Sequence, residues 1–316
     1  MNRFLTIIKR FFRYLVNFGP RLTFFYIVYP RFGGRKAILR RHDEIKRYIK
    51  RNFSSVLNKY TDAVYTDEII VADNRNIWVC WLQGADNMPD IVRVCYKSVI
   101  ANADGRKVVL ITADNVEQYI SIPDFIKDKV ANGKMSRTHF ADYIRISLLK
   151  NFGGLWIDAT VFVTDKINID CKLPFFSVKQ HPDSIHFVSQ YRWAVWILGC
   201  SKQCGAVMFD CLENLFLAYL KKKSFFIDFF LFDYFLAVMY DEIPYVKQLV
   251  DKCPFNNPDA YLLGSMLNDE CDSVAFAQLT AGNTFHKLSW KQEFQTATPA
   301  GKDTFYSFIK RDNDYE

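Results

Sequence analysis

One segment of the chain, residues 137–163, constrains the fold more than any other. Its first part has the character of a helix over residues 137–151, and Gly153 fits the end of that helix, because glycine closes many helices. Its second part, residues 155–163, is predicted to be a strand whose side chains point alternately to opposite faces. A helix joined to a strand through a tight glycine turn predicts an α/β protein.

The polar side chains of this segment are spaced as a ligand site would need them. Asp142 and Arg145 are three residues apart and share a helix face, although a plain ion pair within the helix is the alternative. Gly154 permits close backbone approach. Asp158 and Thr160 project together from an otherwise apolar strand, and their oxygens suit a hard cation and the phosphates that it carries. The alternative for Asp158 is a solvated acid at the end of the strand.

The segment resembles sugar transferases of the GT-A fold. The pattern consists of D-x-x-R at Asp142 and Arg145, then a glycine pair, an aromatic residue, and Asp158 with Thr160 in a D-x-T sequence. It is similar to the DxD-containing glycosyltransferase family 32, and more similar to the capsular polysaccharide synthesis proteins, in which the second acid is commonly Thr. Weaker resemblances to that branch extend the similarity to about residues 60–295. They are residues 77–84, 228–234 and 285–291.

This resemblance implies a fold, an activity and partners. The fold would be GT-A-like (Rossmann-like), with a mixed, mostly parallel sheet flanked by helices. The activity would be transfer of a sugar from a nucleotide-diphosphate donor to a growing bacterial surface polysaccharide or lipid-linked glycan, with retention at the anomeric carbon. Asp142 would then lie near sugar or ribose hydroxyls, and Arg145 near the diphosphate or the catalytic acid.

The resemblance also implies a site for Mn²⁺ or Mg²⁺. Asp158 would hold the ion, which would neutralise the charge that grows on the leaving phosphate. His286 loosely matches the His that often completes the metal shell near the end of GT-A domains, although a lone His is more often structural. Thr160 is a weaker, neutral ligand than the usual second Asp, so a metal-independent site is the alternative.

Further donor contacts are expected at two places. Trp81, Gln83 and Gly84 follow a predicted strand, and ligands in open α/β sheets bind beyond the carboxyl ends of strands. A simple loop is the alternative there. Lys287 and Lys291 would meet the diphosphate as point charges, and the alternative is that they are solvated surface lysines.

Asp233 is the second candidate catalytic residue. It lies in an aromatic helix predicted over residues 225–240, and a buried acid needs a partner. We expect Asp233 either to position acceptor hydroxyls or to pair with an arginine such as Arg192.

Alternating strand-like and helix-like segments on both sides of this block predict an α/β sheet with helices on both faces. The other predicted strands are residues 77–82, 108–112, 175–178 and 186–190, and the other predicted helices are residues 91–101, 205–222 and 225–240.

The charge of the chain is concentrated at its N-terminus. Residues 1–51 hold 14 Lys and Arg against Asp43 and Glu44, a net charge of +12, and since the whole chain is +7, the remainder is −5. Such confinement argues against a nucleic-acid partner. We expect a helical arm over residues 1–51 and a catalytic domain over residues 52–316.

The arm is predicted to contact a membrane surface. Apolar and basic residues of segment 1–18 can take opposite sides of a helix, which is typical of a helix lying in an anionic membrane surface. The alternative is an amphipathic helix packed on the domain. No segment has the roughly 20 apolar residues that span a bilayer. The eight cysteines lack paired metal spacing, which indicates a reducing compartment, so we expect a cytoplasmic protein, peripheral on the inner face of the bacterial cell membrane.

Two other functions remain open at this point. A nucleotidyltransferase on a similar sheet would use the same metal and phosphates, but no Gly-rich signature loop is found near the N-terminus. A non-catalytic membrane-associated adaptor of polysaccharide synthesis would retain the fold, and the D-x-T sequence lends this alternative some weight.

Overall fold

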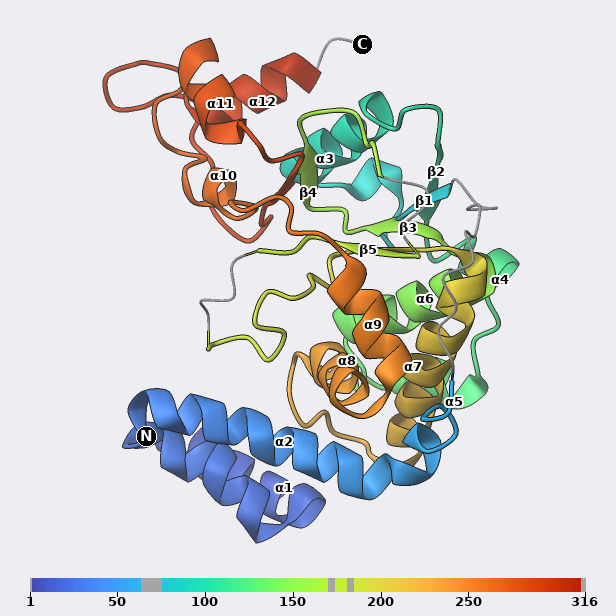
Figure 1. The fold of residues 1–316 in the computed structure, drawn as a ribbon. Coiled ribbons are helices and arrows are strands. Elements are labelled where there is room, and N and C mark those ends of the chain that lie inside the picture. The colour runs from blue at the N-terminus through green and yellow to red at the C-terminus, as the bar shows by residue number, and fades with distance from the viewer. Residues whose placement is uncertain (1, 64–75, 170–173, 181–184, 314–316) are drawn as a thin grey trace.

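The computed structural model of the protein describes residues 2–63, 76–169, 174–180 and 185–313. Its centre is a five-stranded sheet with the strand order β2-β1-β3-β6-β5 (Figure 1). The strands are β1 (Asn76–Cys80), β2 (Lys107–Ile111), β3 (Gly154–Ile157), β5 (Phe175–Ser177) and β6 (Ile197–Cys200).

The sheet is mixed but mostly parallel, as the sequence predicts. β1 pairs in parallel with β2 on one side and with β3 on the other, whereas β6 is antiparallel to both of its neighbours, β3 and β5. The chain leaves β1 in one direction to form β2 and then crosses back to form β3. The strand order therefore reverses between β1 and β3.

Two hydrophobic cores lie on the two faces of the sheet, because alternate strand residues point to opposite sides. Trp78 and Trp156 enter the first core, and Ile77 and Leu155 enter the second. The first core is covered by α6 (Arg137–Phe152), α7 (Lys202–Lys222), α8 (Leu231–Glu242) and α9 (Pro244–Lys252) (Figure 1). The second is covered by α3 (Asp90–Ala101), α12 (Phe305–Asn313) and a small antiparallel sheet of β4 (Val161–Val163) and β7 (Phe285–Lys287).

Short helices connect these layers. They are α4 (Val116–Tyr119) and α5 (Asp124–Ala131) between β2 and α6, and α10 (Leu262–Ser265) and α11 (Ser273–Thr280) between α9 and β7.

The predicted strand over residues 155–163 is wrong in one respect, because the structure divides it into β3 and β4. The chain turns between them: the Asp158 N–H donates to the carbonyl of Trp196 at 2.9 Å, and the Val161 N–H donates to the carbonyl of Asp158 at 3.0 Å. β4 then leaves the large sheet and pairs with β7. Asp158 and Thr160 therefore lie on a turn at the end of β3, not along a continuous strand.

Two other predicted elements also differ from the structure. Residues 186–190 form bends and turns instead of a strand, because the chain reverses at Gln190 and Tyr191, which both have positive φ. The helix predicted over residues 225–240 begins only at Leu231. Strands β6 and β7 were not predicted, whereas the predicted helices 91–101, 137–151 and 205–222 and strands 77–82, 108–112 and 175–178 are confirmed within a few residues.

The N-terminal residues form helices that pack against the body of the protein. α1 (Asn2–Thr23) is interrupted at Gly19, where φ is 82°, and the π-helical turn η1 (Phe24–Val28) and the short 3-10 helix η2 (Tyr29–Arg31) lead to α2 (Gly34–Leu57). α2 contacts α7 and α8 (Figure 1).

These N-terminal helices share the first core with the rest of the chain. Tyr14, Ile45 and Ile49 are buried in it, and the Tyr14 hydroxyl donates to the carbonyl of Ile227 at 2.6 Å. Among the described residues, no helix is both long and apolar enough to cross a membrane.

Candidate functional site

A cavity of about 670 Å³ lies at the carboxyl ends of β1 and β3. In open α/β sheets, ligands bind at this edge where the strand order reverses. The volume lies within the roughly 300–1,000 Å³ of small-molecule sites. The cavity is lined by residues 80–83, Arg137, Thr138, Ala141, Asp142, Arg145, Trp156, residues 158–160, Val195, Trp196, Phe229, Phe230, Phe232, Asp233 and residues 287–291.

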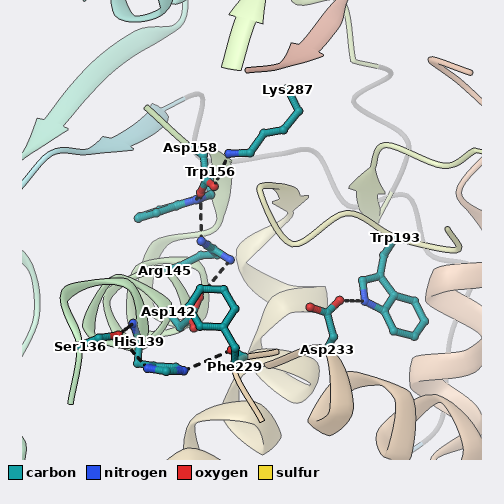
Figure 2. Close-up of polar contacts among 10 residues, drawn as sticks. All are labelled: Ser136, His139, Asp142, Arg145, Trp156, Asp158, Trp193, Phe229, Asp233 and Lys287. Atoms are coloured by element: carbon teal, nitrogen blue, oxygen red, sulfur yellow. Dashed lines mark hydrogen bonds and ion pairs between the residues drawn. The ribbon is translucent and has the colours of Figure 1, made fainter. Parts of the chain in front are cut away.

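Asp158 is the centre of the polar contacts in this cavity (Figure 2). Its Oδ1 accepts hydrogen bonds from Arg145 Nη2 at 3.0 Å and from Trp156 Nε1 at 2.8 Å. Its Oδ2 accepts one from Lys287 Nζ at 2.9 Å, and the same ammonium donates to Thr160 Oγ1 at 2.7 Å. The turn after β3 thus holds Asp158 between two cationic side chains.

Arg145 links the helix α6 to this turn. The side chain is buried, and its Nη1 lies 3.4 Å from Asp142 Oδ1, one turn earlier on the same helix face. The guanidinium lies over the Trp156 ring at 4.8 Å and over the Phe232 ring at 5.4 Å. Its Nε and Nη1 atoms are buried and make no hydrogen bond with the described residues, so the guanidinium is not saturated by its neighbours.

Three carboxyl groups line the cavity and differ in their pKa. Burial alone would raise the pKa of Asp158, but the charges of Lys287 and Arg145 outweigh it, so that this pKa is lowered. Burial raises the pKa of Asp142 to about 6 against the opposing charge of Arg145. Burial also raises the pKa of Asp233 to about 7, with an opposing hydrogen bond from Trp193.

The partner of Asp233 is Trp193, not Arg192. Trp193 Nε1 donates to Asp233 Oδ1 at 3.0 Å (Figure 2), whereas the Arg192 guanidinium lies over the Tyr240 ring at 4.2 Å. The Arg192 guanidinium also lies over the Trp193 ring at 5.0 Å, and its Nε donates to the Ser189 carbonyl at 2.9 Å, so these contacts hold it. Asp233 faces the cavity from α8, on the side opposite Lys287.

The structure brings most of the predicted site residues together and leaves three away from the cavity wall. Those lining it are Trp81, Gln83, Asp142, Arg145, Asp158, Thr160, Asp233, Lys287 and Lys291. Gly84 shapes the turn after β1, where its N–H donates to the carbonyl of Trp81 at 3.0 Å. Gly154 and His286 also lie outside the lining.

Gly154 serves the packing of two strands. Its φ is +90°, and a Cβ atom at this position would lie 2.7 Å from the carbonyl oxygen of Asn76 and 3.1 Å from Trp78 Nε1. The close approach that the sequence predicts is therefore made by β1, and Gly154 does not line the cavity.

His286 points away from Asp158, because it alternates with Lys287 along β7. The imidazole is fully buried, and its Nε2 lies 3.1 Å from the Asn283 carbonyl and 3.2 Å from Thr164 Oγ1. Burial lowers the pKa of His286 to about 4. The structure does not place this imidazole with Asp158 and Thr160, as a shared metal site would require.

Several aromatic residues of the cavity were not identified from the sequence. Phe229 and Phe230 are 56% and 46% exposed, and Trp290 is 45% exposed and meets Trp81 edge to face at 6.0 Å. Exposed aromatic faces at a cavity rim suit sugar rings, which are apolar on one side. The Phe-rich segment before α8 was the available signal, but it was assigned to the helix.

His139 holds the loop 223–230 against α6 and was also not identified. Its Nε2 lies 3.2 Å from the Phe229 carbonyl and its Nδ1 lies 2.8 Å from Ser136 Oγ (Figure 2). Its ring stacks on Phe226. Ser136 caps the N-terminus of α6, so one cluster fixes both the helix and the aromatic rim.

The residues of the cavity do not fit a bound divalent metal. Around Thr160 there is one carboxylate, Asp158, and both of its oxygens already accept from cations. Mg²⁺ and Mn²⁺ prefer several oxygen ligands, usually including more than one carboxylate or phosphate. Within the described part of the chain, no three His, Cys, Asp or Glu side chains gather as metal ligands, and the cysteines whose side chains are described form no disulfide with one another.

The fold and the cavity together define an α/β ligand-binding protein whose site lies at the switch point of its sheet. The cavity wall carries four basic residues, Arg137, Arg145, Lys287 and Lys291, against three acids, two of which have a raised pKa. Such a site suits an anionic ligand. The chain belongs to the capsular polysaccharide synthesis protein family, whose model matches residues 29–309 and so begins within the N-terminal helices.

One curated relative is also similar. A stretch of 110 residues is 26% identical to the O-glycosyltransferase braB of Annulohypoxylon truncatum, and it covers 32% of this chain. The match spans only 26% of the length of that relative. No solved structure matches the chain significantly.

Proposed function

We propose that this protein is a glycosyltransferase that takes a sugar from a nucleotide-diphosphate donor and adds it to a growing bacterial surface polysaccharide or lipid-linked glycan. Membership of the capsular polysaccharide synthesis family and the similarity to an O-glycosyltransferase support a glycosyltransferase-like role. The observation that carries the proposal is the cationic cluster around Asp158 inside a cavity at the switch point of the sheet.

The donor diphosphate would lie against Arg145 and Lys287. Both side chains are fixed by Asp158, so little conformational entropy is lost when they meet a phosphate. Trp81 and Gln83, at the end of β1, would contact the nucleotide, and Lys291 extends the basic wall on that side. Cations held at the leaving group stabilise the negative charge that develops as the sugar–phosphate bond breaks.

The acceptor would enter from the side of Asp233. A second hollow of about 210 Å³ shares Phe229, Phe230 and Asp233 with the large cavity, and Tyr26 and Arg41 of the N-terminal helices line its far wall. Aromatic faces with a few polar groups are suited to a carbohydrate chain. This arrangement supports an acceptor path that runs between the N-terminal helices and the donor site.

The reaction would join the acceptor oxygen to the anomeric carbon as the bond to the diphosphate breaks. We infer retention of configuration from the family resemblance. In that route the departing diphosphate receives the proton of the acceptor hydroxyl, and Asp233 orients this hydroxyl by a hydrogen bond. A product with inverted configuration would instead give Asp233 the role of general base.

The N-terminal helices would hold the protein at an anionic membrane. They expose the apolar residues Leu5, Phe12, Val16, Phe24, Phe32 and Leu39 beside exposed Lys and Arg side chains. Apolar insertion combined with basic charge is the usual basis of interfacial binding. A lipid-linked acceptor would then be presented at the same surface.

The first test is calorimetric titration of a panel of nucleotide sugars, followed by a transfer assay with the donor that binds. Asp158→Asn is expected to retain the fold by circular dichroism and to lose at least ~100-fold of transfer, because Arg145 and Lys287 lose the charge that positions them. Asp165→Asn, which changes an exposed acid outside the cavity lining, serves as the control. Undiminished transfer by Asp158→Asn would remove this acid from the site, and donor binding without transfer to any glycan would favour the adaptor function.

A further inference from the structure

The ammonium of Lys287 bridges the two oxygens that the sequence predicts as metal ligands. Lys287 Nζ lies 2.9 Å from Asp158 Oδ2 and 2.7 Å from Thr160 Oγ1. A divalent ion shared by these oxygens would need the space that this ammonium fills. The D-x-T sequence and the lysine on β7 are therefore parts of a single arrangement.

The electrostatics of the site also disfavour a further cation. Asp158 carries one negative charge and already meets the positive charges of Arg145 and Lys287 at hydrogen-bond distance. A divalent ion added here would be repelled by both, and Thr160 would add only a neutral ligand. Where the D-x-D pattern has a second Asp, this chain has Thr160, and the Lys287 ammonium supplies a fixed positive charge at the same place.

The backbone holds Lys287 firmly at this place. β7 pairs with β4 so that Lys287 lies opposite Val161, and the Lys287 N–H donates to the Ala260 carbonyl at 2.7 Å. The next residue, Leu288, donates its N–H to the Thr160 carbonyl at 2.9 Å. A Cβ at Gly264 would lie 2.7 Å from the Lys287 carbonyl oxygen, so a neighbouring backbone also closes on this strand.

The same ammonium can still reach a ligand. Its side chain is 20% exposed and lines the cavity. An ammonium has three N–H donors, and Asp158 and Thr160 take two of them, which leaves one for a phosphate oxygen. Arg145, held against the same carboxylate, adds a second positive charge to the cavity wall.

We propose that Lys287 is the resident cation of the donor site, and that the diphosphate of the donor binds directly to Lys287 and Arg145 without a divalent metal. This inference rests on the proposed function, because it concerns the same cavity and the same donor. Lys287 then acts as a binding residue whose charge replaces that of a metal at the leaving group.

The test measures binding, not turnover. Calorimetric titration of the full chain with UDP, GDP, dTDP and CDP in EDTA is expected to find one nucleotide that binds, with an affinity that changes less than about 3-fold when Mn²⁺ or Mg²⁺ replaces EDTA. Lys287→Met should weaken that binding about 10- to 100-fold, the usual range for one charge-assisted hydrogen bond. Lys287→Arg should retain most of it.

The control is Lys291→Met, which removes a basic residue that lines the same cavity but has no contact with Asp158. It should weaken binding less than Lys287→Met, and circular dichroism should show that all variants fold. Electron paramagnetic resonance of free Mn²⁺ gives a second readout: the wild-type chain should take up no ion, whereas the double variant Lys287→Ala, Thr160→Asp should acquire a site.

Binding that is lost in EDTA and restored by Mn²⁺, or one Mn²⁺ taken up per wild-type chain without nucleotide, would overturn the inference and leave the proposed function standing. A Lys287→Met variant that binds as tightly as wild type would also overturn it. Absence of nucleotide binding both with and without metal would reject the proposed function together with the inference.

Discussion

Asp142, Asp158 and Asp233 share one cavity, yet their neighbours set them apart. Asp158 meets two cations and its pKa is lowered, whereas burial raises the pKa of Asp142 to about 6 and that of Asp233 to about 7. Carboxyl groups whose surroundings separate their pKa values commonly take different roles in a reaction. This division is consistent with the proposed roles, in which Asp158 is the fixed anion beside the donor and Asp233 meets the acceptor.

The raised pKa of Asp233 has a consequence for stability. An unfolded Asp has a pKa of about 3.9, below the value of about 7 in the folded chain. Unfolding therefore releases this proton between these pH values, so the contribution of Asp233 to folding free energy becomes less favourable as pH rises from about 4 to about 7 and is constant above. Denaturant unfolding should show Asp233→Asn gaining stability relative to wild type across this window.

A matched variant separates the effect of Asp233 on stability from the titration of the other acidic groups of the chain. Glu117→Gln changes an exposed acid that pairs with Lys127, and its stability difference from wild type should stay nearly constant over the same window. Parallel pH curves for wild type and Asp233→Asn would show that Asp233 is ionised in the folded chain.

At the level of elements, the contact of β1 with β3 depends on Gly154. Gly154→Ala places a methyl group 2.7 Å from the Asn76 carbonyl oxygen at a φ of +90°. We expect this change to destabilise the fold by ~2–4 kcal/mol, since it combines backbone strain with a clash between two strands. The measurement is the free energy of unfolding of Gly154→Ala and of wild type by chemical denaturation.

Gly105→Ala is the matched control for the strand clash. Gly105 also has a positive φ, +73°, but a Cβ there would meet nothing within 4 Å. Its cost should be ~1 kcal/mol, which is backbone strain alone. An equal decrease in the free energy of unfolding for the two variants would show that β1 and β3 can move apart without destabilising the fold.

Local sequence patterns predicted the helices and strands whose signals lie within a few residues. They failed where contacts with residues distant in sequence determine the structure. Helix 137–151, its glycine end and the start of β3 were readable because each signal lies within a few residues. The turn at Asp158 was not, because it is set by a hydrogen bond to Trp196, and β7 becomes a strand only by pairing with β4.

The same limit applies to the site. Asp142, Arg145 and Asp158 were predicted together because a single motif contains them, and the cavity does contain all three. The contact of Lys287 with Asp158 and Thr160 joins positions more than a hundred residues apart, so no local spacing could predict it. The sequence predicted only that Lys287 would meet the diphosphate. Alternation along β7 would have separated Lys287 from His286, but β7 itself was not predicted.

Across the whole molecule, the N-terminal helices belong to the same body as the cavity that we propose to bind the donor. Removing residues 1–51 would take Tyr14, Ile45 and Ile49 out of the first core, so a truncated chain would confuse loss of folding with loss of membrane binding. Membrane attachment is better tested by changing exposed charges on the intact chain.

The triple variant Lys9→Gln, Arg35→Gln, Lys36→Gln tests that attachment. All three side chains are exposed, and at about 1 kcal/mol for each basic residue near an anionic surface, affinity for phosphatidylserine vesicles should fall ~100-fold. The control removes three exposed lysines elsewhere, Lys107, Lys134 and Lys166, and should change sedimentation with vesicles far less. Equal losses in the two triple variants would reject an N-terminal membrane surface.

The hydrogen bonds from Tyr14 to Ile227 and from Tyr26 to Asp228 tie the N-terminal helices to the loop beside Asp233. If those helices lie on a bilayer, the mouth of the cavity sits at a fixed height and angle above it. Only a glycan whose reactive end stands at that height above its lipid could be extended, so rigid attachment would select acceptors by length as well as by sugar identity.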